Sequence, residues 1–210
     1  MKITAIEDQK KHKNRKSVFL DGEFAFGIDA FSLYALKLRE GDEITEHELI
    51  HIKQKVLLED AKNRAAKLLS ARSYTERDMM RKLIDYTGSE EIAQQTVTFL
   101  KEYRLIDDRD YAKRYASDCL NIKRLGKRSI RFKLLQKGIP ASLADETLEE
   151  MDFGETELEN LKLLLQKKLG GNLEFKNLMK AKRYLASKGY GFDEIDQAIN
   201  ALKAESEDWI

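Results

Sequence analysis

Residues 105–139 of the chain, LIDDRDYAKRYASDCLNIKRLGKRSIRFKLLQKGI, predict two consecutive helices. Asp107 is a good N-cap, and Asp108 and Asp110 follow in the first turn, where carboxylates satisfy free backbone N–H groups and oppose the helix dipole. Apolar side chains then recur at helical spacing. They are Tyr111, Ala112, Tyr115, Cys119 and Ile122. Gly126 interrupts this pattern, and a second helix directs apolar residues inward before it stops at Gly138. Those inward residues are Ile130, Leu134 and Leu135.

The charges of this region are sorted by sign along the chain. From residue 113 to residue 137, Asp118 alone opposes a set of cations, which are Lys113, Arg114, Lys123, Arg124, Lys127, Arg128, Arg131, Lys133 and Lys137. From residue 138 to residue 160 there is no lysine or arginine, and the charged residues are Asp145, Glu146, Glu149, Glu150, Asp152, Glu155, Glu157 and Glu159. Helices that carry charge only for solubility usually mix the two signs. We therefore interpret the cationic stretch as a binding surface for an anionic partner.

The whole chain is close to neutral, with 38 lysines and arginines against 37 acidic residues. This balance excludes a globally basic coat for nucleic acid, so any site for a polyanion has to be local. Charged residues make up 36% of the 210 residues and there is one proline, which is typical of a mainly helical protein with modest cores. The single cysteine excludes an intramolecular disulfide. Since no signal peptide or membrane-spanning run is evident, we expect a cytoplasmic protein without membrane contact.

The first 44 residues differ from the rest because they predict strands. The candidate strands are residues 3–6, 15–20 and 23–28, and Asp21-Gly22 is a strong hairpin signal because both turn positions need positive φ. A short helix is expected over residues 29–38. Thr45 then opens a longer helix with Glu48 in a capping box. The apolar stripe of this helix runs toward Ser70, with a break allowed near residues 59–60.

From about residue 60 the sequence repeats itself with a period of about fifty residues. Three helix ends align, namely LIDYTG at Gly88, LLQKGI at Gly138 and LASKGY at Gly189. Apolar residues stand four positions before these glycines (Ile84, Leu134, Leu185) and eight positions before them (Met80, Ile130, Ala181). A second apolar cluster follows each glycine. Each unit therefore predicts three helices, with the glycine at the end of the middle one.

A trihelical unit of this length has a small core, so neighbouring units must stack to bury enough apolar surface. The expected fold is mainly α, with tandem three-helix repeats that form an elongated curved rod behind a small N-terminal β-meander. The expected domains are residues 1–59 (meander plus helix), 60–106 (repeat 1), 107–153 (repeat 2) and 154–210 (repeat 3). Repeat 3 opens with a leucine-rich helix at Leu158, Leu161, Leu165 and Leu169. The only tryptophan lies in Asp208-Trp209-Ile210, and we expect the natural chain to continue beyond this end.

Short motifs for catalysis are present but lack their structural context. His47-Glu48-Leu49-Ile50-His51 has the H-E-x-x-H pattern of a zinc hydrolase, but the capping box already explains Glu48, and no histidine follows it. The other histidine, His12, lies upstream. Residues 126–129, GKRS, follow a helix rather than a strand, so a phosphate loop is not supported. Cys119 is predicted as a small core residue. Five tyrosines alternate with basic residues, and core packing is favoured over base stacking for them: Tyr74, Tyr103, Tyr111, Tyr115 and Tyr184.

The motifs L-I-D-D-x-x-Y-A-x-x-Y (residues 105–115) and L-G-x-x-x-I-x-x-x-L-x-x-K-G-I (residues 125–139) resemble the RecX family of recombinase regulators. Residues 75–83, TERDMMRKL, are similar to the signature of the first repeat of that family, and residues 175–199 resemble its third repeat. The hairpin VFLDGEFAF is similar to the N-terminal extension of members from Gram-positive bacteria. Lys133 stands where an acidic residue often precedes the leucine of the middle helix, which makes this surface more basic.

The resemblance implies three tandem three-helix repeats, no catalysis and no cofactor. It also implies binding to the RecA–DNA filament, with single- or double-stranded DNA contacted directly or through the filament, to restrain the recombinase, ATPase and coprotease activities. We expect a monomer whose contacts are Lys123, Arg124, Lys127, Arg128 and Arg131, followed by Arg114 and Lys133. Two alternatives stay open: a standalone DNA-binding module that competes for DNA, and more distantly a zinc hydrolase that uses His47 and His51.

Overall fold

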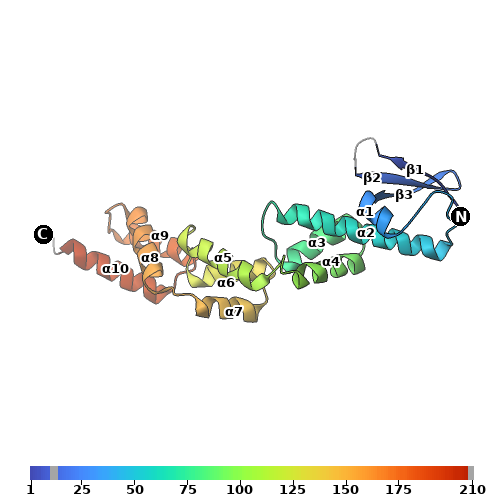
Figure 1. Cartoon of the computed structure of the whole chain (residues 1–210). Coiled ribbons are helices and arrows are strands. Elements are labelled where there is room, and N and C mark those ends of the chain that lie inside the picture. The colour runs from blue at the N-terminus through green and yellow to red at the C-terminus, as the bar shows by residue number, and fades with distance from the viewer. Residues whose placement is uncertain (10–13, 208–210) are drawn as a thin grey trace. The chain divides into compact units, whose positions relative to one another are not determined.

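The computed structural model describes residues 1–9 and 14–207, without the side chains of residues 205–207. His12 and the predicted continuation after Asp208-Trp209-Ile210 lie outside the described residues. The described part contains a three-stranded antiparallel sheet and ten α-helices, so the prediction of a mainly helical chain behind a small sheet is confirmed (Figure 1). The chain divides into two compact units. Unit 1 comprises residues 1–74 and 79–106, and unit 2 comprises residues 75–78 and the chain from Asp107 onward.

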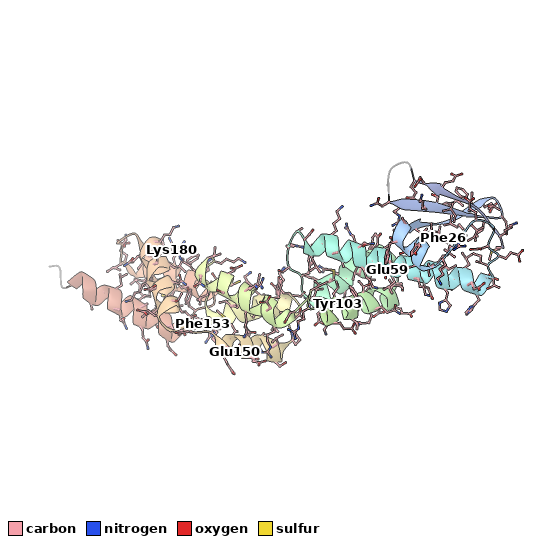
Figure 2. The ribbon with its side chains drawn as sticks, viewed as in Figure 1. Phe26, Glu59, Tyr103, Glu150, Phe153 and Lys180 are labelled. Atoms are coloured by element: carbon pink, nitrogen blue, oxygen red, sulfur yellow. The ribbon has the colours of Figure 1, made fainter. Side chains whose placement is uncertain are left out.

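Unit 1 begins with a meander in the order β1-β2-β3, built from β1 (Ile3–Asp8), β2 (Arg15–Leu20) and β3 (Glu23–Asp29). Val18 lies opposite Ile6 on β1 and Phe26 on β3. Asp21 and Gly22 have φ values of 50° and 89°, so the predicted Asp-Gly hairpin turn is confirmed. Buried side chains from the sheet, among them Phe26 (Figure 2), pack against the first half of the long helix α2 (Glu46–Leu69). Three strands alone are marginal, and this helix supplies the missing core.

The short helix α1 (Ala30–Ala35) is capped by Asp29, whose side chain accepts a hydrogen bond from the backbone N–H of Ser32. The long helix α2 (Glu46–Leu69) starts with the predicted capping box between Thr45 and Glu48. The break that the sequence allowed near residues 59–60 is wrong, because α2 is continuous there. The spacing of its apolar residues is irregular at this point because the helix changes its packing partner there.

The two halves of α2 serve different cores. Ile52 and Val56 belong to the core of the sheet, whereas Ala61 and Ala65 belong to the core of repeat 1. Asp60, at the change between them, accepts a hydrogen bond from Nη2 of Arg15 on β2 at 2.9 Å. This hydrogen bond raises the pKa of Arg15. The irregular spacing of apolar residues therefore marks a change of packing partner along one continuous helix.

Repeat 1 consists of α2, α3 (Glu76–Thr87) and α4 (Glu90–Glu102). Met79 and Leu83 are fully buried in its core, and Met80 and Ile84 only partly. The sequence alignment on Gly88 is therefore one residue out of register in this repeat. The reason is that α3 continues to Thr87, directly before the glycine, while the middle helix of repeat 2 ends at Gln136, two residues before Gly138. Tyr103 is 66% exposed, so its predicted place in the core is wrong. It is the C-cap residue, directly after the last residue of α4.

Repeat 2 consists of α5 (Asp108–Asn121), α6 (Lys127–Gln136) and α7 (Ala141–Glu150), and Asp107 caps α5 as predicted. Its core is formed mainly by small and branched side chains, which are Ala112, Ala116, Cys119, Leu120, Leu125, Ile130, Leu134, Ile139, Ala144 and Leu148. Cys119 is fully buried, as predicted. Ile122 is 74% exposed, and its predicted place in the core is wrong. Helical spacing predicted that Ile122 points into the core. Because α5 already ends at Asn121, Leu120 lies in the core instead.

Repeat 3 consists of α8 (Gly154–Leu169), α9 (Phe175–Ser187) and α10 (Phe192–Glu207). In the leucine-rich helix α8, Leu161, Leu165 and Leu169 are buried, and Leu158 is 46% exposed in the first turns. Gly88, Gly138 and Gly189 all have positive φ and follow the middle helices of their repeats. The three-helix organisation predicted from these glycines is confirmed.

Two junctions inside unit 2 use the same kinds of hydrogen bond. At the first, Thr75 Oγ1 donates a hydrogen bond to the carbonyl of Lys137, and the backbone N–H of Glu76 donates to Asp108. At the second, the backbone N–H of Gly126 donates to the carbonyl of Lys188.

The backbone N–H of Lys127 then donates to Oε1 of Glu157 at the second junction. In both cases two groups of the following repeat contact the N-terminal end of a middle helix. One is the glycine turn that ends the middle helix of the following repeat, and the other is a carboxylate from its first helix. A Cβ atom on Gly138 would lie 2.4 Å from Nε of Arg77, and one on Gly189 would lie 2.4 Å from the backbone nitrogen of Ser129. Both turns therefore require glycine for close approach as well as for positive φ.

Candidate functional site

The predicted contact residues lie on α5, on α6 and on the loop between them. Arg114 belongs to α5, Lys123 and Arg124 to the loop, and Lys127, Arg128, Arg131 and Lys133 to α6. Lys123, Lys127 and Arg128 are exposed, whereas Arg124, Arg131 and Lys133 are half-buried. The structure therefore brings most of the set together at one end of repeat 2, but the surroundings of its members differ.

Two of the predicted contact residues are engaged in ion pairs within repeat 2. Arg131 donates two hydrogen bonds to Asp145 on α7, from Nε at 2.5 Å and from Nη2 at 2.9 Å. This bidentate pair raises the pKa of Arg131 and lowers the pKa of Asp145. Arg114 pairs in the same way with Asp110, one turn earlier on α5. Both guanidinium groups have a carboxylate partner, so we rank them below the other cations as contacts.

The acidic stretch after residue 138 pairs with the cations of α5 as well. Arg109 contacts Glu146 through two hydrogen bonds of 2.8 Å, and Lys113 contacts Glu150 at 2.6 Å. Glu150 ends α7, as its label in Figure 2 shows. Arg109 holds the pKa of Glu146 below its usual value. Many of the charges that are separated by sign along the chain are thus paired in the structure, because carboxylates of α7 contact cations of α5 and α6. Arg109 is an ion-pair partner that the sequence analysis did not single out.

Two of the exposed lysines rest on aromatic rings. Nζ of Lys123 lies 4.7 Å from the centroid of the Tyr115 ring, and Nζ of Lys127 lies 5.6 Å from that of Phe153, labelled in Figure 2. An ammonium group over a ring is attracted by the electrons of the ring but keeps its charge. Tyr115 itself is half-buried, and burial raises the pKa of its hydroxyl. Its ring supports a cation rather than standing free for base stacking.

Arg128 and Lys133 differ from Arg131, because neither forms an ion pair with any residue of ranges 1–9 and 14–207. Arg124 contributes its backbone to the structure. Its φ is 51°, and its carbonyl accepts a hydrogen bond of 3.1 Å from the hydroxyl of Tyr190 in repeat 3. Burial raises the pKa of that hydroxyl and keeps it a hydrogen-bond donor. The loop that carries Lys123 and Arg124 is thereby fixed against repeat 3.

A pocket of about 320 Å³ lies at the start of α6, where repeats 2 and 3 meet. Lys127, Arg128 and Arg131 line one part of it, and Glu157 and Glu194 line another. Burial raises the pKa of Glu157, whose carboxylate accepts the backbone N–H of Lys127. Since cations and carboxylates share this pocket, it is better suited to joining the repeats than to holding a free anion. The place of Glu157 in the acidic stretch of the sequence does not indicate this role.

The two histidines of the H-E-x-x-H motif lie next to each other on α2. His47 and His51 lie in the first turns of α2 with their ring centroids 5.3 Å apart. In the part of the chain that the structure describes, no group of three or more histidine, cysteine, aspartate or glutamate side chains is placed to hold a metal ion. None of the described helices combines the length and the apolar character needed to cross a membrane.

Comparison with known proteins identifies the family. Residues 1–45 match the model of the regulatory protein RecX N-terminal domain, residues 107–148 that of the RecX second three-helix domain, and residues 155–199 that of the RecX third three-helix domain. A regulatory protein RecX of Clostridium botulinum (strain Alaska E43 / Type E3) is 35% identical over 204 residues, which cover 94% of each chain. The chain belongs to the RecX family.

Other RecX proteins agree in length and fold. The regulatory protein RecX of Caldanaerobacter subterraneus subsp. tengcongensis is 32% identical over 200 residues, covering 95% of this chain and 99% of the relative. A crystal structure of regulatory protein RecX aligns with a TM-score of 0.73 at 30% identity over 95% of this chain and 98% of the other. The crystal structure of RecX from Lactobacillus salivarius shares the fold, with a TM-score of 0.64 at 24% identity over 70% of this chain and 97% of the other. The three-helix organisation is thus that of known RecX structures.

Proposed function

We propose that this RecX-family chain binds the RecA–DNA filament through the cationic surface of repeat 2 and restrains the recombinase, ATPase and coprotease activities of RecA. The proposal describes a noncatalytic regulator that acts as a cytoplasmic monomer without a cofactor. The observation that carries it is a group of cations in repeat 2 that have no carboxylate partner among the described residues, among them Lys123, Lys127, Arg128 and Lys133. Family membership supports a regulatory role.

The unpaired cations stand out because their neighbours are paired. Arg109, Lys113, Arg114 and Arg131 all have carboxylate partners, so repeat 2 has enough acidic side chains to neutralise part of its surface. Charges left without a partner on a binding surface attract and steer an oppositely charged molecule, and they do so more strongly at low salt. A filament that presents DNA phosphates and acidic protein surface is such a molecule.

Inhibition of RecA-dependent ATP hydrolysis on single-stranded DNA tests this proposal. The double variant Lys127→Ala/Arg128→Ala should inhibit less strongly than the wild type. Its binding to the filament should also depend less on salt, by about one unit of log–log slope for each phosphate that the variant no longer neutralises. Lys53→Ala/Lys55→Ala is a matched control, because it removes two exposed cations from α2. Inhibition by the folded Lys127→Ala/Arg128→Ala variant equal to that of the control would contradict the proposed site.

Binding to naked DNA at the same salt concentration separates the proposal from the competing interpretation as a DNA-binding module. A much higher affinity for preformed filaments than for naked single- or double-stranded DNA is expected. Equal affinities would instead favour a module that competes with RecA for DNA.

A further inference from the structure

Repeats 2 and 3 each place two lysines over one tyrosine ring. In repeat 2, Nζ of Lys123 and Nζ of Lys137 lie 4.7 Å and 6.0 Å from the centroid of Tyr115. In repeat 3, Nζ of Lys168 and Nζ of Lys188 lie 5.1 Å and 5.8 Å from the centroid of Tyr184. We name these the repeat-2 lysine pair (Lys123, Lys137) and the repeat-3 lysine pair (Lys168, Lys188).

The C-cap lysines of the two pairs occupy equivalent places in their repeats. Lys137 and Lys188 are the C-caps of the middle helices α6 and α9, each directly before the closing glycine, with φ and ψ of −77° and −6° in one and −79° and −9° in the other. Lys168 lies in the last turn of α8, whereas Lys123 lies in the loop, two residues after the last residue of α5. Lys123 and Lys168 are exposed, and the C-cap lysines Lys137 and Lys188 are half-buried.

The tyrosines come from different helices, since Tyr115 belongs to α5 and Tyr184 to α9. The same arrangement of two ammonium groups over a half-buried ring is therefore produced from different positions of the repeat. Repeat 1 has Thr87 directly before its closing glycine, so a lysine is missing from that place.

Neither pair is neutralised by a carboxylate. None of the four lysines forms an ion pair within the residues that the structure describes, whereas Lys113 pairs with Glu150 and Lys182 with Asp196. A lysine at a helix C-terminus complements the partial negative charge of that end. The interaction with the helix end explains one lysine at each C-terminus. It does not explain a second ammonium group over the same ring, which concentrates positive charge at one point. The ring holds both ammonium groups without removing their charge.

We propose that the repeat-2 and repeat-3 lysine pairs bind phosphates of the DNA backbone in the filament. The identity of the filament rests on the proposed function, and the new element is a second contact in repeat 3. A lysine ammonium is a compact charge that suits a phosphate oxygen. DNA carries phosphates densely along its whole length, so it can meet cations of both repeats at once.

The salt dependence of filament binding tests this proposal with matched variants. Lys168→Gln/Lys188→Gln should lower the log–log salt slope by roughly 2, Lys123→Gln/Lys137→Gln should do the same, and the quadruple variant should lower it by roughly twice as much. Lys53→Gln/Lys55→Gln, which removes two exposed lysines from α2, should leave the slope unchanged. Lys168→Arg/Lys188→Arg should keep the wild-type slope, because the charges remain.

Each result bears on one of the two proposals. If the wild type does not bind the filament, the proposed function fails. If the wild type binds and Lys168→Gln/Lys188→Gln behaves like the α2 control, the contact in repeat 3 is refuted while the proposed function stands.

The same variants are titrated with a single-stranded oligonucleotide at low salt, where a parallel decrease in affinity supports contact with phosphate. A decrease confined to the filament would refute the DNA contact and indicate an acidic protein surface instead. The variants should fold, because the substitutions leave the backbone carbonyls of Lys137 and Lys188 in place. Circular dichroism checks that each variant is folded.

Discussion

The substitution Gly126→Ala tests the junction between repeats 2 and 3. Gly126 has φ −74° and ψ 162°, which alanine adopts without strain, so any cost comes from contact alone. A Cβ atom there would lie 2.6 Å from both the carbonyl carbon and the oxygen of Gly189. Since ordinary contacts are about 3.5 Å or longer, the two backbones must separate by roughly 1 Å. That separation breaks the hydrogen bond from Gly126 to the carbonyl of Lys188.

The expected cost combines overpacking, typically about 1–3 kcal/mol, with a broken hydrogen bond of about 1 kcal/mol. A destabilisation of about 2–4 kcal/mol lowers the melting temperature of a chain of this size by roughly 4–16 °C. Thermal unfolding followed by circular dichroism measures it, and hydrogen exchange should show faster opening near residues 188–191. Gly154→Ala is the matched control, because a Cβ atom there meets only the side chain of Asp152, at 3.1 Å. A melting temperature and exchange pattern for Gly126→Ala equal to those of the control would refute the close backbone contact.

Two further predictions concern the core and the pH dependence of unit 2. Leu134→Ala should lower the free energy of unfolding by about 2–5 kcal/mol in urea denaturation, because Leu134 is fully buried, and half-buried Leu135→Ala should cost less. Equal costs would contradict the assignment of Leu134 to the centre of the core. Burial raises the folded pKa of Glu157 above its ordinary value of 4.5, so the folded state binds the proton more tightly. The stability that Glu157 contributes is present below the unfolded pKa and is lost as pH rises through the folded pKa. Glu157→Gln does not titrate but keeps an oxygen for the N–H of Lys127, so its stability relative to the wild type should increase as pH rises from about 4 to about 8. A difference that is independent of pH would show that Glu157 is not desolvated.

The secondary structure of this chain follows closely from local signals. The Asp21-Gly22 turn, the capping box at Thr45 and Glu48, and the glycines that end the middle helices each depend on a few neighbouring residues, and all are found in the structure. Local periodicity fails where packing partners change. The apolar stripe of α2 is irregular because the helix passes from one core to another. Ile122 continues the apolar spacing of α5, but the helix ends one residue before it.

The candidate site was less predictable because charge along a sequence does not show which charges meet. Arg131 and Lys133 lie two residues apart on α6, yet Arg131 is bound to Asp145 of another helix while Lys133 has no ion pair in the described part of the chain. Glu157 belongs to the acidic stretch of the sequence, although its carboxylate accepts the first N–H of α6. One signal was available in the sequence: Lys137 and Lys188 both directly precede the glycine that closes a middle helix. The domain boundaries at residues 59/60, 106/107 and 153/154 and the rod-like shape stay predictions.

The central claim is that the cationic surface of repeat 2 contacts the RecA–DNA filament, and electron microscopy of the protein bound to that filament tests it most directly. The expected density shows the loop before α6 and the first seven residues of α6, residues 123–133, facing the filament. A bound complex in which this surface faces solvent, with another part of the chain in contact, would contradict the claim.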